Sequence, residues 1–289
     1  MGPRERRRKG VRGGEAPRIK LDEGRGRSVR SVPDCILAAC YMPTFRLTIA
    51  YDGTGFVGWQ RQASGTSIQG LLEDALGALD GREVAVIGAG RTDAGVHAIG
   101  QVAGVSIERA IDGPSLARAV NARLPEAIRV TDATETPDTF HARFNSRSKT
   151  YRYRIWNDEV LSPFERAYAW HVAAPPLDVD AMAEAALVLE GRHDFAAFQA
   201  AGTETRTTDR TVFSSRVSRG PERPLIICEI SGNGFLRHMV RNIAGTLGEV
   251  GRGHHPVAWV EEVLASRERA RAGPTAPPEG LFLVRVDYE

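Results

Sequence analysis

The sequence predicts an α/β or α+β protein, because segments with strand periodicity and helix periodicity interleave from residue 42 onward. Residues 45–51 alternate between apolar and polar side chains, as in a half-buried strand. Residues 68–79 place six apolar side chains at helical spacing, which predicts one buried helix face. With 289 residues, 42% of them apolar, the chain is long enough for one large domain or two smaller ones.

The remaining elements follow from the same patterns. Thr66 and Gln69 form a capping-box pattern in front of the first helix, and Asp80-Gly81 predicts its end. Pro175-Pro176 is the clearest boundary between two halves of the chain. Further strands are predicted at 84–87, 101–107, 149–156, 225–230 and 281–286, and further helices at 115–124, 178–190, 238–250 and 257–264.

Residues 1–41 differ in composition from the rest of the chain. They hold 11 Lys and Arg against 5 Asp and Glu, whereas the remaining residues hold 27 against 31. With so few apolar residues, this segment cannot bury enough surface to order itself. We therefore predict a disordered basic extension at 1–41, an N-terminal half at 42–174 and a C-terminal half at 175–289.

Cysteine use and hydropathy argue against secreted and membrane classes of protein. Cys35, Cys40 and Cys228 form no Cys-x-x-Cys pair and no disulfide framework. We therefore expect reduced thiols and a cytoplasmic location. The sequence contains no run of 18 apolar residues, so it predicts no membrane span.

One loop combines glycines with a carboxylate and an arginine. Gly88, Gly90 and Gly95 surround Arg91 and Asp93 just after a predicted strand, and such loops often hold catalytic groups. A dinucleotide-binding fingerprint is excluded, because its third glycine would fall at Asp93, where a carboxylate would repel a pyrophosphate. From the loop alone, a catalytic Asp93 and an Asp93 that only closes an Asx-turn remain equally open.

Residues 139–157 combine basic and aromatic side chains and contain no acid. Cations neutralise phosphates and aromatic rings stack on bases, so this tract indicates RNA binding. A strand with a solvated basic face is the alternative. The side chains concerned are Arg143, Arg147, Lys149, Arg152 and Arg154, with Phe140, Phe144, Tyr151, Tyr153 and Trp156 between them.

One arginine near the start of a predicted helix calls for an anionic partner. Arg241 follows the apolar Val240 near the start of a predicted helix. A partly buried guanidinium requires an anion such as the Asp93 carboxylate, and a surface arginine on the helix flank is the alternative.

The basic segment 1–41 is either a misassigned start, with Met42 opening the protein, or an arm that adds RNA affinity. We favour the misassigned start.

Seven blocks, in the same order, resemble the TruA-type tRNA pseudouridine synthase family over residues 43–289. Their order makes the resemblance far more specific than any single block. Residues 1–41 fall outside it. The blocks are 51–54 with 58–62, 90–97, 121–125, 140–144, 151–153, 238–242 and 279–284.

The resemblance implies an isomerase that converts uridine to pseudouridine at positions 38, 39 and 40 of the tRNA anticodon stem-loop. It implies an α+β fold of two similar α/β halves around a central, mainly antiparallel sheet with helices packed on it. The half 42–174 would be catalytic, and the half 175–289 would complete the cleft. Family members are homodimers that bind one tRNA across both subunits.

The resemblance also implies roles for individual residues. Asp93 would be the essential carboxylate and Arg241 its ion-pair partner, and Tyr151 would pack on the target base. Arg91 would enter the RNA helix as that base leaves. The other residues expected to contact RNA are Arg143, Arg147, Lys149, Arg152 and His238.

The reaction exchanges a C–N bond for a C–C bond without net redox change, so we expect no metal and no cofactor. An ionised carboxylate can act on the sugar or base as a nucleophile or as a base, and the sequence leaves both roles open for Asp93. Two other functions remain as alternatives. One is a non-catalytic RNA-binding protein, and the other is a metal hydrolase that uses His238, His254, His255 and an acidic residue.

Overall fold

The computed structural model describes residue 2 and residues 42–202, 205–221 and 224–288. The predicted disorder of residues 1–41 therefore falls outside the described residues, apart from Gly2. Residues 40–289 group into one compact unit. In the described part of the chain, no helix is long and apolar enough to cross a membrane.

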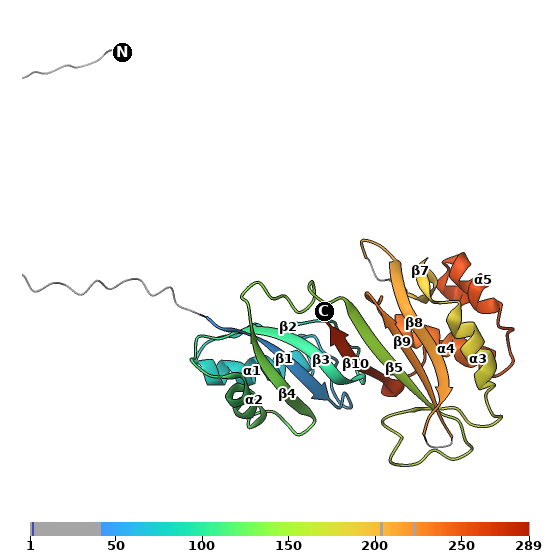
Figure 1. The fold of residues 1–289 in the computed structure, drawn as a ribbon, viewed down its shortest axis with the longest axis horizontal. Coiled ribbons are helices and arrows are strands. Elements are labelled where there is room, and N and C mark those ends of the chain that lie inside the picture. The colour runs from blue at the N-terminus through green and yellow to red at the C-terminus, as the bar shows by residue number, and fades with distance from the viewer. Residues whose placement is uncertain (1, 3–41, 203–204, 222–223, 289) are drawn as a thin grey trace, which may run out of the picture. The chain divides into compact units, whose positions relative to one another are not determined.

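A mainly antiparallel sheet forms the centre of this unit (Figure 1). Its described strands are β1 (Thr44–Tyr51), β2 (Ile87–Gly88), β3 (His97–Ser106), β4 (Ile128–Thr136), β5 (Ser148–Trp156), β6 (Trp170–His171), β7 (Gly191–Asp194), β8 (Asp209–Arg219), β9 (Leu225–Gly232) and β10 (Leu281–Asp287). They follow the order β4-β1-β3-β10-β5-β9-β8-β7, with β2 paired to β3 and β6 to β5. The predicted α+β class with a mainly antiparallel sheet is confirmed.

β10 joins two groups of strands. It runs parallel to β3, with Phe282 opposite His97, and antiparallel to β5, with Leu283 opposite Tyr151. β10 therefore separates β3 from β5 in the sheet, as Figure 1 shows. The middle of the sheet is thus built from an early strand, a middle strand and the last strand in the sequence.

Helices pack on both strand groups. They are α1 (Ile68–Asp80), α2 (Gly113–Asn121), α3 (Val179–Leu187), α4 (Met239–Gly251) and α5 (Trp259–Ser266). α2 packs on α1 and β4, whereas α3 packs on β8 and α4. Each strand group thus has its own helices.

Side-chain periodicity explains the first strand and the first helix. Phe45, Leu47 and Ile49 alternate along β1 and are fully buried, and Leu72 and Leu76 bury the facing side of α1. Full burial of one such side chain contributes roughly 1.5–3 kcal/mol. These elements are therefore fixed mainly by one apolar stripe each.

The ends of α1 agree with the sequence prediction at one end only. Gly81 ends the helix in the left-handed conformation at φ 76°, as predicted. The predicted capping box on Thr66 is wrong by one residue, because the Ser67 hydroxyl caps the helix by accepting from the Gly70 N–H. Gln69 is engaged elsewhere, since its carbonyl oxygen accepts a hydrogen bond from the Gln60 amide.

The predicted boundary between residues 174 and 175 stays a prediction. β5 precedes this boundary in sequence, yet it pairs with β9 along its whole length and with β10. The pairing of β5 therefore places it with the later strands rather than with β1, β3 and β4.

Candidate active site

The loop that carries Asp93 lies between β2 and β3 and is held by hydrogen bonds. The Trp59 N–H donates to the Thr92 carbonyl at 3.1 Å, and the Tyr51 and Thr92 hydroxyls lie 2.8 Å apart. The Gln101 side-chain amide donates to the Gly90 carbonyl at 2.9 Å. These contacts fix the backbone immediately before Asp93.

Close approach of two backbone segments explains one glycine. Gly58 has φ 101°, and a Cβ atom added there would lie 2.6 Å from the Thr92 carbonyl oxygen. Only glycine combines this conformation with so close a contact. Gly58 therefore allows the backbone of the block at 58–62 to pack directly against the Asp93 loop.

The Asp93 carboxylate is directed toward the start of α4. Its Oδ2 lies 3.3 Å from Arg241 Nη1 and 3.5 Å from His238 Nε2. In the described part of the chain, its side-chain hydrogen-bond donor is Arg241 and not the backbone of its own turn. The carboxylate is 30% exposed, so a ligand can reach it.

Arg241 is a well-fixed partner. Its Nε donates to the Ala276 carbonyl at 2.7 Å, and its Nη1 donates to Asp93. The Ala276 N–H returns a hydrogen bond to the Arg241 carbonyl at 3.1 Å. The Arg241 side chain is only 13% exposed, and a guanidinium that is buried to this degree requires an anionic partner. Asp93 is that partner.

Asn242 fastens the segment around Ala276 to α4. Its Nδ2 donates to the Phe198 carbonyl at 2.7 Å, and its Oδ1 accepts from the Thr275 hydroxyl at 2.6 Å. Arg269 Nη2 donates to the same oxygen at 3.1 Å. This buried network fixes the carbonyl that orients Arg241.

His238 occupies an unusual backbone position. It precedes α4 with φ 61° in the left-handed region, where residues other than glycine rarely lie. Burial lowers the pKa of its imidazole, the Asp93 charge opposes that shift, and Arg241, Arg237 and Arg269 add to it. The site thus favours a neutral imidazole beside the carboxylate.

Tyr151 provides a buried aromatic wall. It is 7% exposed, and Phe235 packs edge-on against its ring at 5.1 Å between centroids. Its hydroxyl lies beside Gly90, 3.9 Å from the position of an added Cβ atom. Burial raises the pKa of the phenol well above its usual value, and the charges of Tyr51 and Asp93 add to the shift. The phenol is therefore neutral.

Lys149 and Arg210 form a basic edge beside this wall. The Lys149 side chain passes 3.6 Å from the position of an added Cβ atom at Gly90. Burial lowers the pKa of Lys149, and the nearby charges of Arg143 and Arg210 lower it further. Arg210 lies on β8, 61 residues further along the chain than Lys149, and the sequence offered no signal that would bring the two together.

The other basic residues of the 139–157 tract have different surroundings. Arg91, Arg143 and Arg147 are exposed. Arg152 donates to Glu229 at 2.9 Å, and it points to the opposite face of β5 from Tyr151, because neighbouring residues of a strand alternate between faces. Its predicted RNA contact stays a prediction, without support from its place in the fold.

The histidines of the metal-hydrolase alternative have separate partners. His254 Nδ1 lies 2.7 Å from Glu249 Oε2, and His255 stacks on Trp259 at 3.7 Å. Within residues 42–202, 205–221 and 224–288, no three His, Cys, Asp or Glu side chains are placed to share one metal ion. His238 contacts Asp93 instead.

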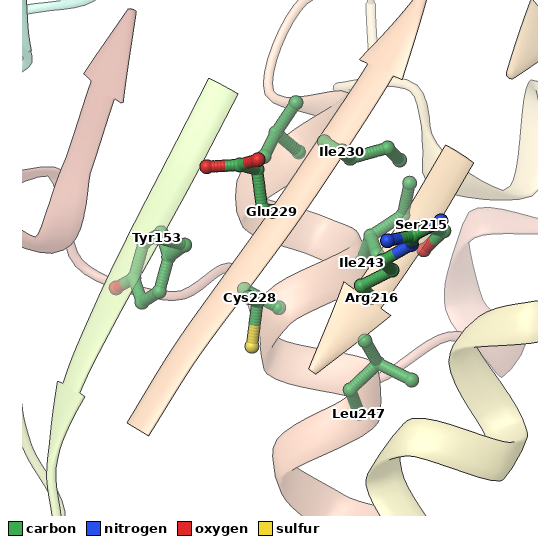
Figure 2. Close-up of a pocket in the computed structure, with 10 residues that line it drawn as sticks. Tyr153, Ser215, Arg216, Cys228, Glu229, Ile230, Ile243 and Leu247 are labelled. Atoms are coloured by element: carbon green, nitrogen blue, oxygen red, sulfur yellow. The ribbon is translucent and has the colours of Figure 1, made fainter. Parts of the chain in front are cut away.

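A small cavity lies between α4 and the sheet, and Asp93 is not among its lining residues. Figure 2 shows it between β5, β8, β9 and the helix, with Tyr153 and Cys228 on its wall. Its volume of about 10 Å³ is near the lower limit for one water molecule. Burial raises the pKa of the Cys228 thiol to about 12, so this cysteine is a protonated packing residue.

Comparison with known proteins shows the family to which the chain belongs. A family described as tRNA pseudouridine synthase matches residues 47–145 and 185–289. A protein named tRNA pseudouridine synthase A from Myxococcus xanthus is 49% identical over 247 residues, which cover 86% of this chain and 92% of that protein. Proteins of the same name from Solibacter usitatus and Parvibaculum lavamentivorans are 48% and 44% identical, over 86% of this chain and 100% of each relative. The chain therefore belongs to the tRNA pseudouridine synthase family.

Proposed function

We propose that the protein isomerises uridine to pseudouridine at positions 38, 39 and 40 of the tRNA anticodon stem-loop, with Asp93 as the essential carboxylate. The observation that carries the proposal is the contact of Asp93 with Arg241, 148 residues away, in a member of this family. A carboxylate paired with a guanidinium, and still partly exposed, suits attack on a sugar carbon or removal of a sugar proton. Both roles are open for Asp93.

The bond changes show what the reaction requires. The N1–C1′ bond of uridine breaks and a C5–C1′ bond forms. C5 loses its proton, and N1 gains one. Since no electron leaves the substrate, the reaction calls for no redox cofactor, and we expect none.

The target base has to leave its stack before Asp93 can act on it. Unstacking costs a few kcal/mol, and the flat ring of Tyr151 recovers part of this cost by packing on the extruded base. Arg91 is exposed on the same loop as Asp93. We propose that it fills the space that the base vacates in the RNA helix.

The surroundings of Asp93 support phosphate contacts on one edge. Lys149 is the best placed residue, because its side chain lies beside Gly90. Arg143 and Arg210 are near enough for their charges to act on Lys149. Arg147 and His238 are further contacts that we propose. We also propose that two copies of the chain form a homodimer that holds one tRNA, and that the protein works in the cytoplasm.

Tritium release from tRNA labelled with [5-³H]uridine tests the activity, because C5 loses its hydrogen only when pseudouridine forms. We expect Asp93→Asn to reduce release by about 10⁴-fold or more while tRNA binding persists. Asp180→Asn, which changes an exposed carboxylate in the first turn of α3, is the matched control and should keep full activity.

The same assay separates the enzyme from a non-catalytic RNA-binding protein. Full tritium release by the Asn variant would rule out Asp93 as the essential carboxylate. Binding without release by the unmodified protein would favour the RNA-binding function. Sequencing the labelled tRNA would then locate pseudouridine, and its absence from positions 38, 39 and 40 would contradict the proposed specificity.

A further inference from the structure

The proposed reaction needs a proton acceptor beside Asp93. Once C5 is bonded to C1′, it carries both the sugar carbon and its original hydrogen. Removing that proton returns the C–H electron pair to form C5=C6. The C6=N1 pair then moves to N1, which takes up a proton. A single group that accepts the proton from C5 and then gives a proton to N1 accounts for both steps.

Few side chains near Asp93 can exchange a proton. In the described part of the chain, the titratable groups that contact its carboxylate are Arg241 and His238. Arg241 keeps its proton in proteins, and Tyr151 is a neutral phenol that is too weak a base. His238 is the group whose proton exchange falls near neutral pH.

The backbone holds the imidazole at the carboxylate. His238 Nε2 lies 3.5 Å from Asp93 Oδ2, and the side chain is 26% exposed, so a nucleotide that touches Asp93 can also touch the imidazole. Among the described residues other than glycine, only His238 and Arg267 have positive φ. Such conformations cluster where function requires a fixed geometry.

Charges around His238 set its protonation. Arg241, Arg237 and Arg269 disfavour the imidazolium, as does burial, and Asp93 favours it. Before the reaction the imidazole is therefore a base. After it accepts a proton, the imidazolium faces the Asp93 carboxylate, which stabilises it.

Resting on the proposed function, we propose that His238 is a further catalytic residue, which accepts the proton from C5 and returns a proton to N1. The imidazole gains one proton and loses one in each cycle, so atoms and charge balance. His238 then takes part in the second half of the reaction, after Asp93 has acted in the first.

Two variants test this role without disturbing the backbone. Asparagine and glycine both tolerate the left-handed conformation, so His238→Asn and His238→Gly should fold normally. Arg267→Asn is the matched control. It makes the same kind of change at φ 59°, at an exposed side chain that pairs with Asp194 at 3.1 Å.

The measurement compares the full-length proteins on tRNA carrying uridine or [5-²H]uridine. We expect His238→Asn to lower kcat by about 10²–10⁴-fold, with KM within about twofold. A primary deuterium isotope effect should appear as proton removal becomes rate-limiting. Added imidazole should restore activity to His238→Gly, and Arg267→Asn should match the unmodified protein.

Different outcomes separate the inference from the function on which it rests. Unchanged kcat in His238→Asn would overturn the inference while leaving the proposed function intact. A raised KM without an isotope effect would do the same and make His238 an RNA contact. An unmodified protein that forms no pseudouridine would overturn the proposed function and the inference together.

Discussion

The loop at Asp93 and the start of α4 supply the two partners of one ion pair, but different contacts hold them. The loop has a close backbone contact, with Gly58 against the Thr92 carbonyl, in addition to its hydrogen bonds with the Tyr51 and Gln101 side chains. The start of α4 is held through side chains, with Arg241 on the Ala276 carbonyl and Asn242 on Phe198. We therefore expect the loop to suffer from added bulk and the start of α4 from lost donors.

Among the changes that distinguish these two regions, the largest effect should follow from removing the Arg241 side chain at the start of α4. Arg241→Ala leaves Asp93 and the Ala276 carbonyl without their common donor, and we expect kcat to fall by about 10³-fold. Single-turnover kinetics on tRNA would measure it. Arg241→Lys should recover only part of the rate, because one ammonium cannot replace the fork of the guanidinium at both acceptors.

A second ion pair at the far end of α4 provides the control. Arg252 lies 2.7 Å from Glu249, with a similar degree of burial, and Arg252→Ala should keep the full rate. If Arg241→Ala and Arg252→Ala were equally active, side-chain contacts at the start of α4 would not position the site.

The next largest effect should follow from adding bulk on the loop side. Gly58→Ala places a Cβ atom 2.6 Å from the Thr92 oxygen at φ 101°, and we expect a loss of about 2–4 kcal/mol in the free energy of unfolding. Urea denaturation would measure it. Gly55→Ala, at φ 81° with nothing within 4 Å, isolates the conformational cost and should lose about 1 kcal/mol. Equal losses would show that the close approach is unimportant.

A smaller, pH-dependent effect should come from His97, which connects the start of β3, at the end of the Asp93 loop, to the turn after β1. Its Nδ1 accepts from the Gly53 N–H at 3.0 Å. Burial lowers the pKa of His97 below its ordinary 6.5, and Asp52 opposes the shift. Below pH 6.5 the unfolded chain therefore binds a proton that the folded chain does not, so stability falls as the pH falls.

We expect this slope to reach at most about 1.4 kcal/mol per pH unit. Unfolding by urea between pH 7.5 and 5.5 would measure it, and His97→Asn should flatten the curve. His171→Asn, at an exposed histidine, should keep the original slope. A His97→Asn curve parallel to that of the unmodified protein would show that the lowered pKa of His97 is not the source of the slope.

Periodicity predicted the elements whose burial is one-sided and apolar. β1, α1 and β10 were predicted within one or two residues for that reason. β4, β7 and β8 were not predicted, because too few of their positions are both buried and apolar. β7 (Gly191–Asp194) has no apolar side chain, and β8 buries Ser215 while Phe213 is exposed. Their places depend on pairing with distant strands, which one sequence does not record.

The residues of the candidate site also divide into those that a local sequence pattern predicted and those that it did not. Asp93 and Arg241 were singled out by local signals, a glycine loop and a charge after an apolar residue, and the structure brings them together. Arg210 carried no local signal. Arg152 was grouped with Tyr151 as part of one basic and aromatic tract, although strand alternation already places these two adjacent residues on opposite faces of β5.

The placement of β10 has a consequence for the order of assembly. During synthesis β1, β3 and β4 emerge first, and β5 and β9 follow, yet neither group can pair with the other until the final strand arrives. Until then each group presents an unpaired edge, which is a site for misassociation. The seven residues of β10 therefore join the two groups of strands last. Tyr151 on β5 gains its second neighbouring strand only when β10 pairs with β5.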